Sequence, residues 1–113
     1  MVKYEIKTDT AENLYDGHGK AFFRRCLEES EYPDNCGLAS LIELEKGTSI
    51  GYHQHTGDSE MYCFVEGEGV YKENGKEYEI KPGMVTMLYD GGWHGMENTG
   101  DGALKFFAVI FKK

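Results

Sequence analysis

The amino-acid sequence predicts an all-β fold in a single domain. Three observations predict it: glycine and aromatic residues are abundant, apolar runs are short, and turn signals separate these runs. The chain has 113 residues, with 15 glycines and 8 tyrosines but only 2 prolines. That length suits one domain large enough to bury a core. No segment of helical length repeats its apolar residues with a convincing 3.6-residue period.

Charge and cysteine content narrow the class of protein. The formal net charge is -8, from 12 basic and 20 acidic residues. This balance argues against nucleic acid or an anionic membrane as partner, because both are bound by basic patches. No apolar run approaches the length of a membrane span, and residues 1–7 are charged rather than signal-like. Three cysteines without CxxC spacing favour a cytoplasmic protein with free thiols.

The first third of the chain carries few strand signals. Residues 20–27 form a strand-like run, and residues 28–35 read as an acidic loop. Residues 38–45 alternate well enough for a strand with one apolar face, made of Leu38, Ser40, Ile42 and Leu44. We therefore divide the chain into N-terminal strands and loops, 1–37, and a main β-domain, 38–113. The N-terminal part is expected to pack on the main domain or on a partner subunit.

The remaining strands follow one another at short intervals. Asn74-Gly75 lies between two alternating runs and is the strongest hairpin signal, because a type I′ turn requires positive φ at both positions. Further strands are expected at residues 60–65, 84–88, 93–97 and 103–111. About nine to eleven short strands with such turns predict a sandwich or a barrel closed on itself. Periodicity alone does not separate these two architectures.

Three histidines and one glutamate form the main candidate site. His53 and His55 are two residues apart, so on a strand their side chains point to the same face. Glu60 follows a short turn, and we expect residues 60–65 to lie antiparallel beside the histidine strand. His94 lies far along the chain. As metal ligands these residues suit a divalent Mn, Fe, Ni, Co or Zn ion with positions left open for water or substrate. The alternative is a solvated histidine pair.

The spacing of these residues extends into two longer motifs. The first runs Gly47, five residues, His53, one residue, His55, four residues, Glu60, six residues, Gly67. The second runs Gly83, five residues, Tyr89, one residue, Gly91, two residues, His94, three residues, Asn98.

Both motifs resemble those of the cupin family in the right order, from Leu38 to Phe111. Tyr89 departs from the pattern because it stands where the family usually has proline. The chain is similar to small single-domain cupins of the oxalate-decarboxylase and germin type. The resemblance implies a double-stranded β-helix, or jelly-roll barrel, with the metal inside one end.

Residues next to the candidate ligands suggest a binding pocket. By strand alternation Tyr62 and Phe64 point inward with Glu60, and Met96 shares the inner face with His94. An apolar, aromatic pocket around a metal would shelter a small ligand from water. Arg24 is a candidate cation at the pocket mouth for a carboxylate group, although a solvated strand position explains it equally well. The catalytic residues are unknown.

Three functions are consistent with this site. The hypothesis that we favour is a metal-dependent enzyme, decarboxylase- or dioxygenase-like, acting on a small oxygenated carboxylate. The alternative is a non-catalytic module that binds or senses a small ligand, and the third is a sugar isomerase or epimerase. We also expect a homodimer, because outward-facing Met61, Cys63 and Val65 and the Phe22-Phe23 strand need covering.

Overall fold

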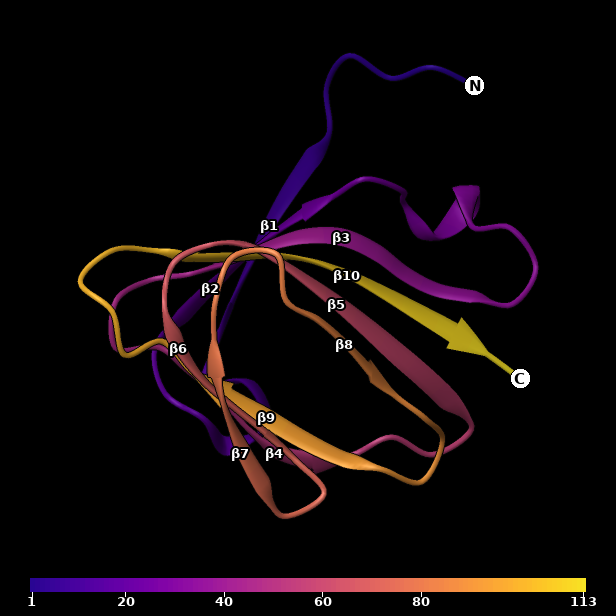
Figure 1. Ribbon diagram of the computed structural model, residues 1–113. Helices are drawn as coiled ribbons and strands as arrows, with labels where there is room; N and C mark the ends of the chain where they lie inside the picture. Colours follow the sequence, from indigo (N-terminus) through magenta and orange to yellow (C-terminus); the bar gives the residue numbers. More distant parts are fainter.

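Two antiparallel β-sheets face one another and enclose the core (Figure 1). The computed structural model describes all residues, 1–113. The strands are β1 (Lys7–Glu12), β2 (Lys20–Arg25), β3 (Cys36–Leu44), β4 (Ser49–Gln54), β5 (Asp58–Glu66), β6 (Gly69–Glu73), β7 (Lys76–Ile80), β8 (Val85–Leu88), β9 (Trp93–Glu97) and β10 (Leu104–Lys112). Two short 3₁₀ turns, η1 (Leu14–Asp16) and η2 (Glu29–Glu31), are the only helical elements.

Strands that are distant in sequence are neighbours in both sheets. One sheet has the order β1-β2-β3-β10-β5-β8, and the other has the order β4-β9-β6-β7. The C-terminal strand β10 therefore lies between β3 and β5, and β9 lies between β4 and β6. This alternation between two sheets is a jelly roll, so the all-β, double-stranded β-helix prediction is confirmed.

The core occupies the space between the two sheets. Alternate residues of β3, from Leu38 to Leu44, are buried as predicted, and Ser40 and Leu44 are fully buried. Phe64 of β5 and Phe106 of β10 pack against each other across neighbouring strands with ring centroids 5.2 Å apart. Apolar alternation on central strands thus sets which face of each strand turns inward.

The hairpin between β6 and β7 is confirmed in detail. Its two central residues, Asn74 and Gly75, have φ of 48° and 84°. Left-handed conformations at both positions match the right-handed twist of the flanking strands.

One expected strand pairing is wrong, and one strand was not predicted. Strand β4 pairs with β9, whereas β5 pairs with β10 and β8 in the opposite sheet. Residues 55–57 are therefore a crossing between sheets and not a hairpin turn. Strand β1 was missed because its sequence is almost entirely polar; it forms by pairing with β2.

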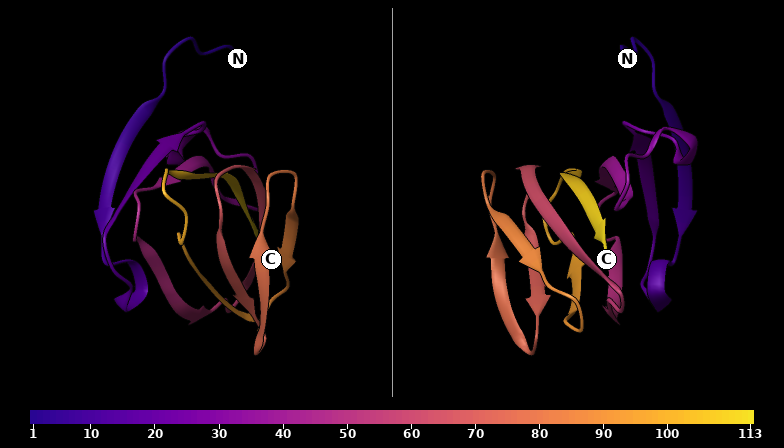
Figure 2. Two further views of the ribbon diagram at one scale, coloured as in Figure 1. Left: turned by 60° about the vertical axis from the view of Figure 1, so that its left-hand side comes forward. Right: turned by 90° about the vertical axis from the view of Figure 1, so that its right-hand side faces the viewer.

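The N-terminal strands extend the six-stranded sheet beyond β3 (Figure 2). Strand β2 pairs directly with β3, so residues 20–25 pack on the barrel of their own chain. Ala21 belongs to the buried core, and Phe23 packs against it. None of the helical elements has the length and apolar character needed to cross a membrane.

Candidate metal centre

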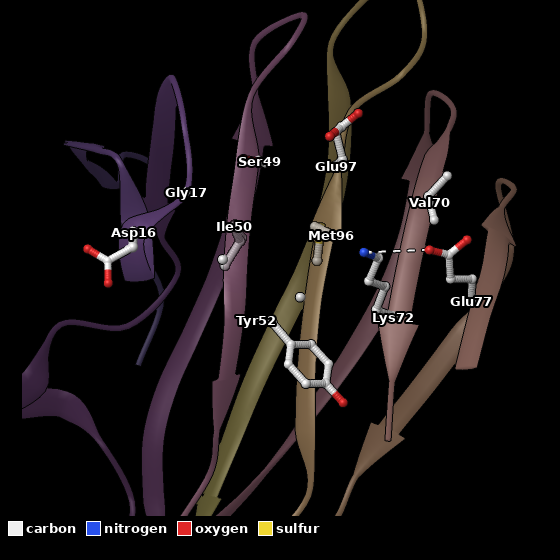
Figure 3. Close-up of a pocket in the computed structure, with 12 residues that line it drawn as sticks. Asp16, Gly17, Ser49, Ile50, Tyr52, Val70, Lys72, Glu77, Met96 and Glu97 are labelled. Carbon is white, nitrogen blue, oxygen red and sulfur yellow. Dashed lines mark ion pairs between the residues drawn. The ribbon is translucent and has the colours of Figure 1, made fainter. Parts of the chain in front are cut away.

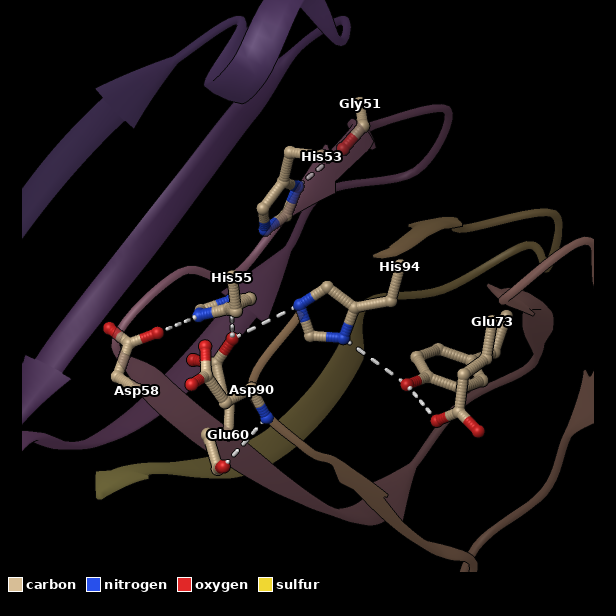
Figure 4. Close-up of polar contacts among 10 residues, drawn as sticks. Gly51, His53, His55, Asp58, Glu60, Glu73, Asp90 and His94 are labelled. Carbon is tan, nitrogen blue, oxygen red and sulfur yellow. Dashed lines mark hydrogen bonds and ion pairs between the residues drawn. The ribbon is translucent and has the colours of Figure 1, made fainter. Parts of the chain in front are cut away.

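The four predicted ligands come from both sheets and meet at one point inside the barrel (Figure 4). His53 of β4 and His94 of β9 are direct cross-strand partners. His55 follows β4, where its backbone exchanges hydrogen bonds with Gly91 and Gly92. Glu60 reaches the histidines from β5 in the opposite sheet. One ligand atom from each residue lies within 4.8 Å of the others. His55, Glu60 and His94 are buried, and His53 is half-buried.

Each histidine is held through its Nδ1 atom by a different partner. Nδ1 of His53 lies 2.7 Å from the Gly51 carbonyl oxygen. Nδ1 of His55 lies 2.7 Å from Oδ1 of Asp58. The carbonyl and the carboxylate can only accept, so both Nδ1 atoms carry a proton.

His94 is held by a short chain of hydrogen bonds. Its Nδ1 lies 3.2 Å from the Tyr71 hydroxyl, and that hydroxyl donates to Oε1 of Glu73 at 2.8 Å (Figure 4). Because the Tyr71 proton is committed to the Glu73 carboxylate, the hydroxyl oxygen accepts from Nδ1 of His94. All three histidines therefore have their second nitrogen, Nε2, free for a ligand.

Two of these Nε2 atoms, those of His55 and His94, face the same carboxylate oxygen of Glu60. Oε1 of Glu60 lies 3.0 Å from Nε2 of His55 and 3.2 Å from Nε2 of His94. Both Nε2 atoms are buried and have no hydrogen-bond donor or acceptor of their own. Lone pairs converging in this way are stabilised by a cation, either a proton on a ring or a metal ion. Imidazole and carboxylate without thiolate suit a divalent transition metal.

Without a metal, the charges in this cluster depend on one another. Burial raises the pKa of Glu60, but His55 and His94, whose Nε2 atoms lie within 3.2 Å of its carboxylate, outweigh burial and hold this pKa at about 2. The nearby Glu60 carboxylate in turn raises the pKa of His55 to about 8. Burial lowers the pKa of His53. Positive charge is therefore favoured beside the Glu60 carboxylate and disfavoured on the His53 ring.

Two tyrosine rings stack on different histidines of the cluster. Tyr62 stacks on His94 with ring centroids 5.0 Å apart and is only 3% exposed. Tyr15, from η1, stacks on His53 with ring centroids 3.7 Å apart and planes 9° apart. Burial raises the pKa of Tyr15, and the carboxylates of Glu60 and Asp58 raise it further.

The four predicted ligand-binding residues have different positions. Tyr62 contacts the cluster, whereas Phe64 and Met96 belong to the hydrophobic core beside it. Arg24 is exposed, and its cross-strand partner Leu41 lies on the outer face of the six-stranded sheet. The register therefore turns Arg24 away from the barrel interior, and the structure does not bring it to the cluster.

Several residues around the cluster were not found from the sequence. Asp58 lies between two motif positions, and only its place beside His55 could have suggested a role. Tyr71, Glu73 and Tyr15 lie on elements outside both motifs, so residue spacing gave no signal for them.

A pocket on the outer face of the four-stranded sheet is separate from this cluster (Figure 3). Its volume is about 350 Å³, and none of the four cluster residues lines it. Gly51 and Gly95 are among the residues that line it, and Lys72 forms an ion pair with Glu77 at 3.5 Å along its wall. The candidate metal centre lies on the opposite side of this sheet, where His94 is fully buried.

Comparison with known proteins identifies the family. Residues 40–110 match the cupin domain. This chain is a cupin. An oxalate-binding protein of Thermotoga maritima is 36% identical to it over 106 residues, which cover 94% of this cupin and 88% of the relative.

Solved structures agree with this assignment. The crystal structure of a predicted oxalate decarboxylase from Thermotoga maritima matches the whole of both chains with a TM-score of 0.92 and 35% identity. A sugar phosphate isomerase of the cupin superfamily from Silicibacter pomeroyi has a TM-score of 0.76 over 96% of this cupin and 72% of its own chain. At 21% identity, the isomerase shows only that the fold is shared.

Proposed function

We propose that this cupin binds one divalent transition metal ion, which in turn binds a small dicarboxylate such as oxalate. The residues that would hold the metal are His53, His55, Glu60 and His94. The observation that carries this proposal is the convergence of the buried Nε2 atoms of His55 and His94 on the Glu60 carboxylate, an arrangement that a cation stabilises. Four protein ligands leave positions open on the metal, where it would act as a Lewis acid toward carboxylate oxygens.

No arginine or lysine side chain pairs with the acidic residues of the cluster, so the negative charge of a bound ligand would be neutralised by the metal itself. Glu60 and Asp58 form ion pairs only with histidines, and Arg24 lies outside the barrel. A dicarboxylate with both groups on the metal needs no second cation, and the relative named as an oxalate-binding protein supports this ligand class. Binding of a dicarboxylate is therefore the function that the site supports best, and we propose that it occurs without turnover.

Elemental analysis tests the metal part of this proposal. Purified protein reconstituted with Mn²⁺ or Co²⁺ and then desalted should retain one ion per chain. The His53→Ala variant should lose most of it, because one of four ligands is gone. His18→Ala is the matched control, since His18 is not part of the cluster, and it should retain the metal. Equal occupancy in all three proteins would refute the assignment.

A product assay separates binding from catalysis. Decarboxylation of oxalate consumes one proton and yields formate and carbon dioxide, so formate is a specific product to measure. Metal-loaded protein incubated with oxalate should form no more formate than metal-free protein. Formate production that depends on the metal would instead establish the decarboxylase function.

A further inference from the structure

A loop from the N-terminal part of the chain lies across strand β4 and brings Tyr15 to the candidate metal centre. The loop spans residues 13–19, and Figure 3 shows Asp16 and Gly17 beside Ser49 of β4. It is fixed by a bridge in which His18 donates to the Ser49 carbonyl at 3.2 Å and Ser49 donates back at 2.7 Å. Strand β4 is the edge of its sheet, so the loop covers backbone groups that no strand pairs.

The backbone of Tyr15 is strained. Its φ is 51° and its ψ is 46°, in the left-handed region that bulky residues avoid. Asn13 also has positive φ, but asparagine tolerates it, and its side chain accepts a hydrogen bond from Gly19. Tyr15 has no such local compensation. Strain of this kind persists where surrounding contacts impose it, often at binding sites.

Two glycines allow the contact that imposes this conformation. A Cβ atom on Gly51 would lie 1.8 Å from the Tyr15 carbonyl oxygen, and one on Gly17 would lie 2.3 Å from the Ser49 carbonyl oxygen. The loop backbone therefore rests directly on the β4 backbone, at a distance that only glycine permits. The consequence is a Tyr15 ring parallel to His53 at 3.7 Å.

The position of Tyr15 is also the accessible side of the cluster. His53 is the least buried of the four predicted ligands, and Tyr15 remains 59% exposed while it covers the His53 ring. The hydroxyl of Tyr15, like those of exposed Tyr78 and Tyr89, forms no hydrogen bond within the chain, whereas those of Tyr52 and Tyr71 do. The Tyr15 phenol is therefore an uncommitted O–H donor beside the cluster.

We propose that Tyr15 is a ligand-positioning residue that donates a hydrogen bond from its hydroxyl to a carboxylate of the bound dicarboxylate. Its ring holds His53 in place, and its hydroxyl selects ligands with an oxygen beyond those that the metal binds. This inference rests on the proposed function, because it assigns a residue to the same ligand. It also gives the strained loop 13–19 a role that folding alone does not require.

Calorimetric titration of oxalate into Co²⁺-loaded protein tests this role. Tyr15→Phe keeps the ring and the loop, so it should retain one Co²⁺ per chain and an unchanged melting temperature. Loss of a hydrogen bond to a charged group should weaken oxalate binding about 10-fold or more. Gly17→Ala, which pushes the loop off β4, should weaken oxalate binding at least as much. Tyr4→Phe removes an exposed hydroxyl that precedes β1 and should bind like wild type.

The outcomes separate this inference from the proposed function. Wild-type protein that takes up no metal, or takes up metal but no oxalate, would refute the proposed function and this role together. Wild-type protein that binds both while Tyr15→Phe binds oxalate equally well would overturn the inference alone. The Co²⁺ absorption spectrum gives a second reading: oxalate should change it at a higher oxalate concentration in Tyr15→Phe than in wild type.

Discussion

The hydrogen-bond partner of Nδ1 in each histidine determines which ring nitrogen is available to bind a metal. Gly51, Asp58 and Tyr71 each hold one Nδ1 atom, by a carbonyl, a carboxylate and a hydroxyl respectively. These three partners fix the ring orientations and leave Nε2 as the ligand atom, as outer hydrogen bonds do in known metal sites. The chemistry of the cluster thus depends on residues that are not ligands themselves.

Tyr71→Phe is expected to weaken metal binding without removing a ligand. The variant leaves Nδ1 of His94 without its hydrogen-bond partner in a buried position, so ring orientation and basicity are no longer fixed. We expect metal affinity to fall about 10- to 100-fold, measured by competition with a chelator of known affinity. Tyr78→Phe, on the neighbouring strand, is the control. Equal affinity in wild type and Tyr71→Phe would show that this hydrogen bond has no part in metal binding.

Asn98, the last residue of the second motif, stabilises a loop and does not reach the cluster. Its buried side-chain amide donates to the carbonyl oxygens of Leu44, Glu45 and Gly102 at 2.9–3.2 Å. Its own oxygen accepts from the backbone of Gly100 at 3.0 Å. The amide therefore ties the turn after β9 to the end of β3, in the opposite sheet.

Replacing Asn98 by alanine should destabilise the fold. The change leaves buried carbonyl groups without donors, so the free energy of unfolding should fall by about 2–4 kcal/mol. Urea denaturation followed by tryptophan fluorescence measures this difference. Thr99→Ala, an exposed neighbour, should stay within about 0.5 kcal/mol of wild type. A similar small effect for Asn98→Ala would contradict the structural role of its amide.

The elements differ in how far their sequence predicts them. Strand β9 begins and ends at the predicted residues, where exposed Trp93 and Glu97 flank three buried residues that include His94. The sequence of β1 contains one apolar residue, Ala11, so only its pairing with β2 makes it a strand. The partner of β5 was predicted wrongly, because a short polar connection serves a hairpin and a crossing between sheets equally well.

The same reasoning explains which parts of the candidate site were predictable. The four clustered side chains could be predicted from residue type and spacing, because each motif is contained in one short stretch of sequence. Their meeting across two sheets, and the contributions of Tyr15 and Tyr71, depend on contacts between distant elements. Arg24 was assigned by its charge alone, whereas strand register determines which way it points.

An apolar row of side chains on the outer face of the six-stranded sheet is relevant to the oligomeric state of the protein. Leu41, Phe107, Cys63 and Val85 lie directly opposite one another on β3, β10, β5 and β8. A parallel row contains Val109, Met61 and Met87. Val85 is 60% exposed. A contiguous apolar surface of this kind typically marks an interface.

We expect this face to form a homodimer in solution. Light scattering at increasing protein concentration should show twice the mass of one chain. Val85→Glu places a charge in the apolar row and should shift the protein toward the monomer, whereas Val2→Glu, outside the sheets, should leave the dimer intact. Monomer at every concentration for wild type would contradict this expectation.

The measurement that tests the central proposal most directly is titration of oxalate into metal-loaded and metal-stripped protein by calorimetry. One oxalate should bind per chain to the loaded protein, and none should bind to the stripped protein or to metal-reconstituted His53→Ala. Equal binding with and without metal, or no binding to the loaded protein, would contradict a dicarboxylate site built on His53, His55, Glu60 and His94.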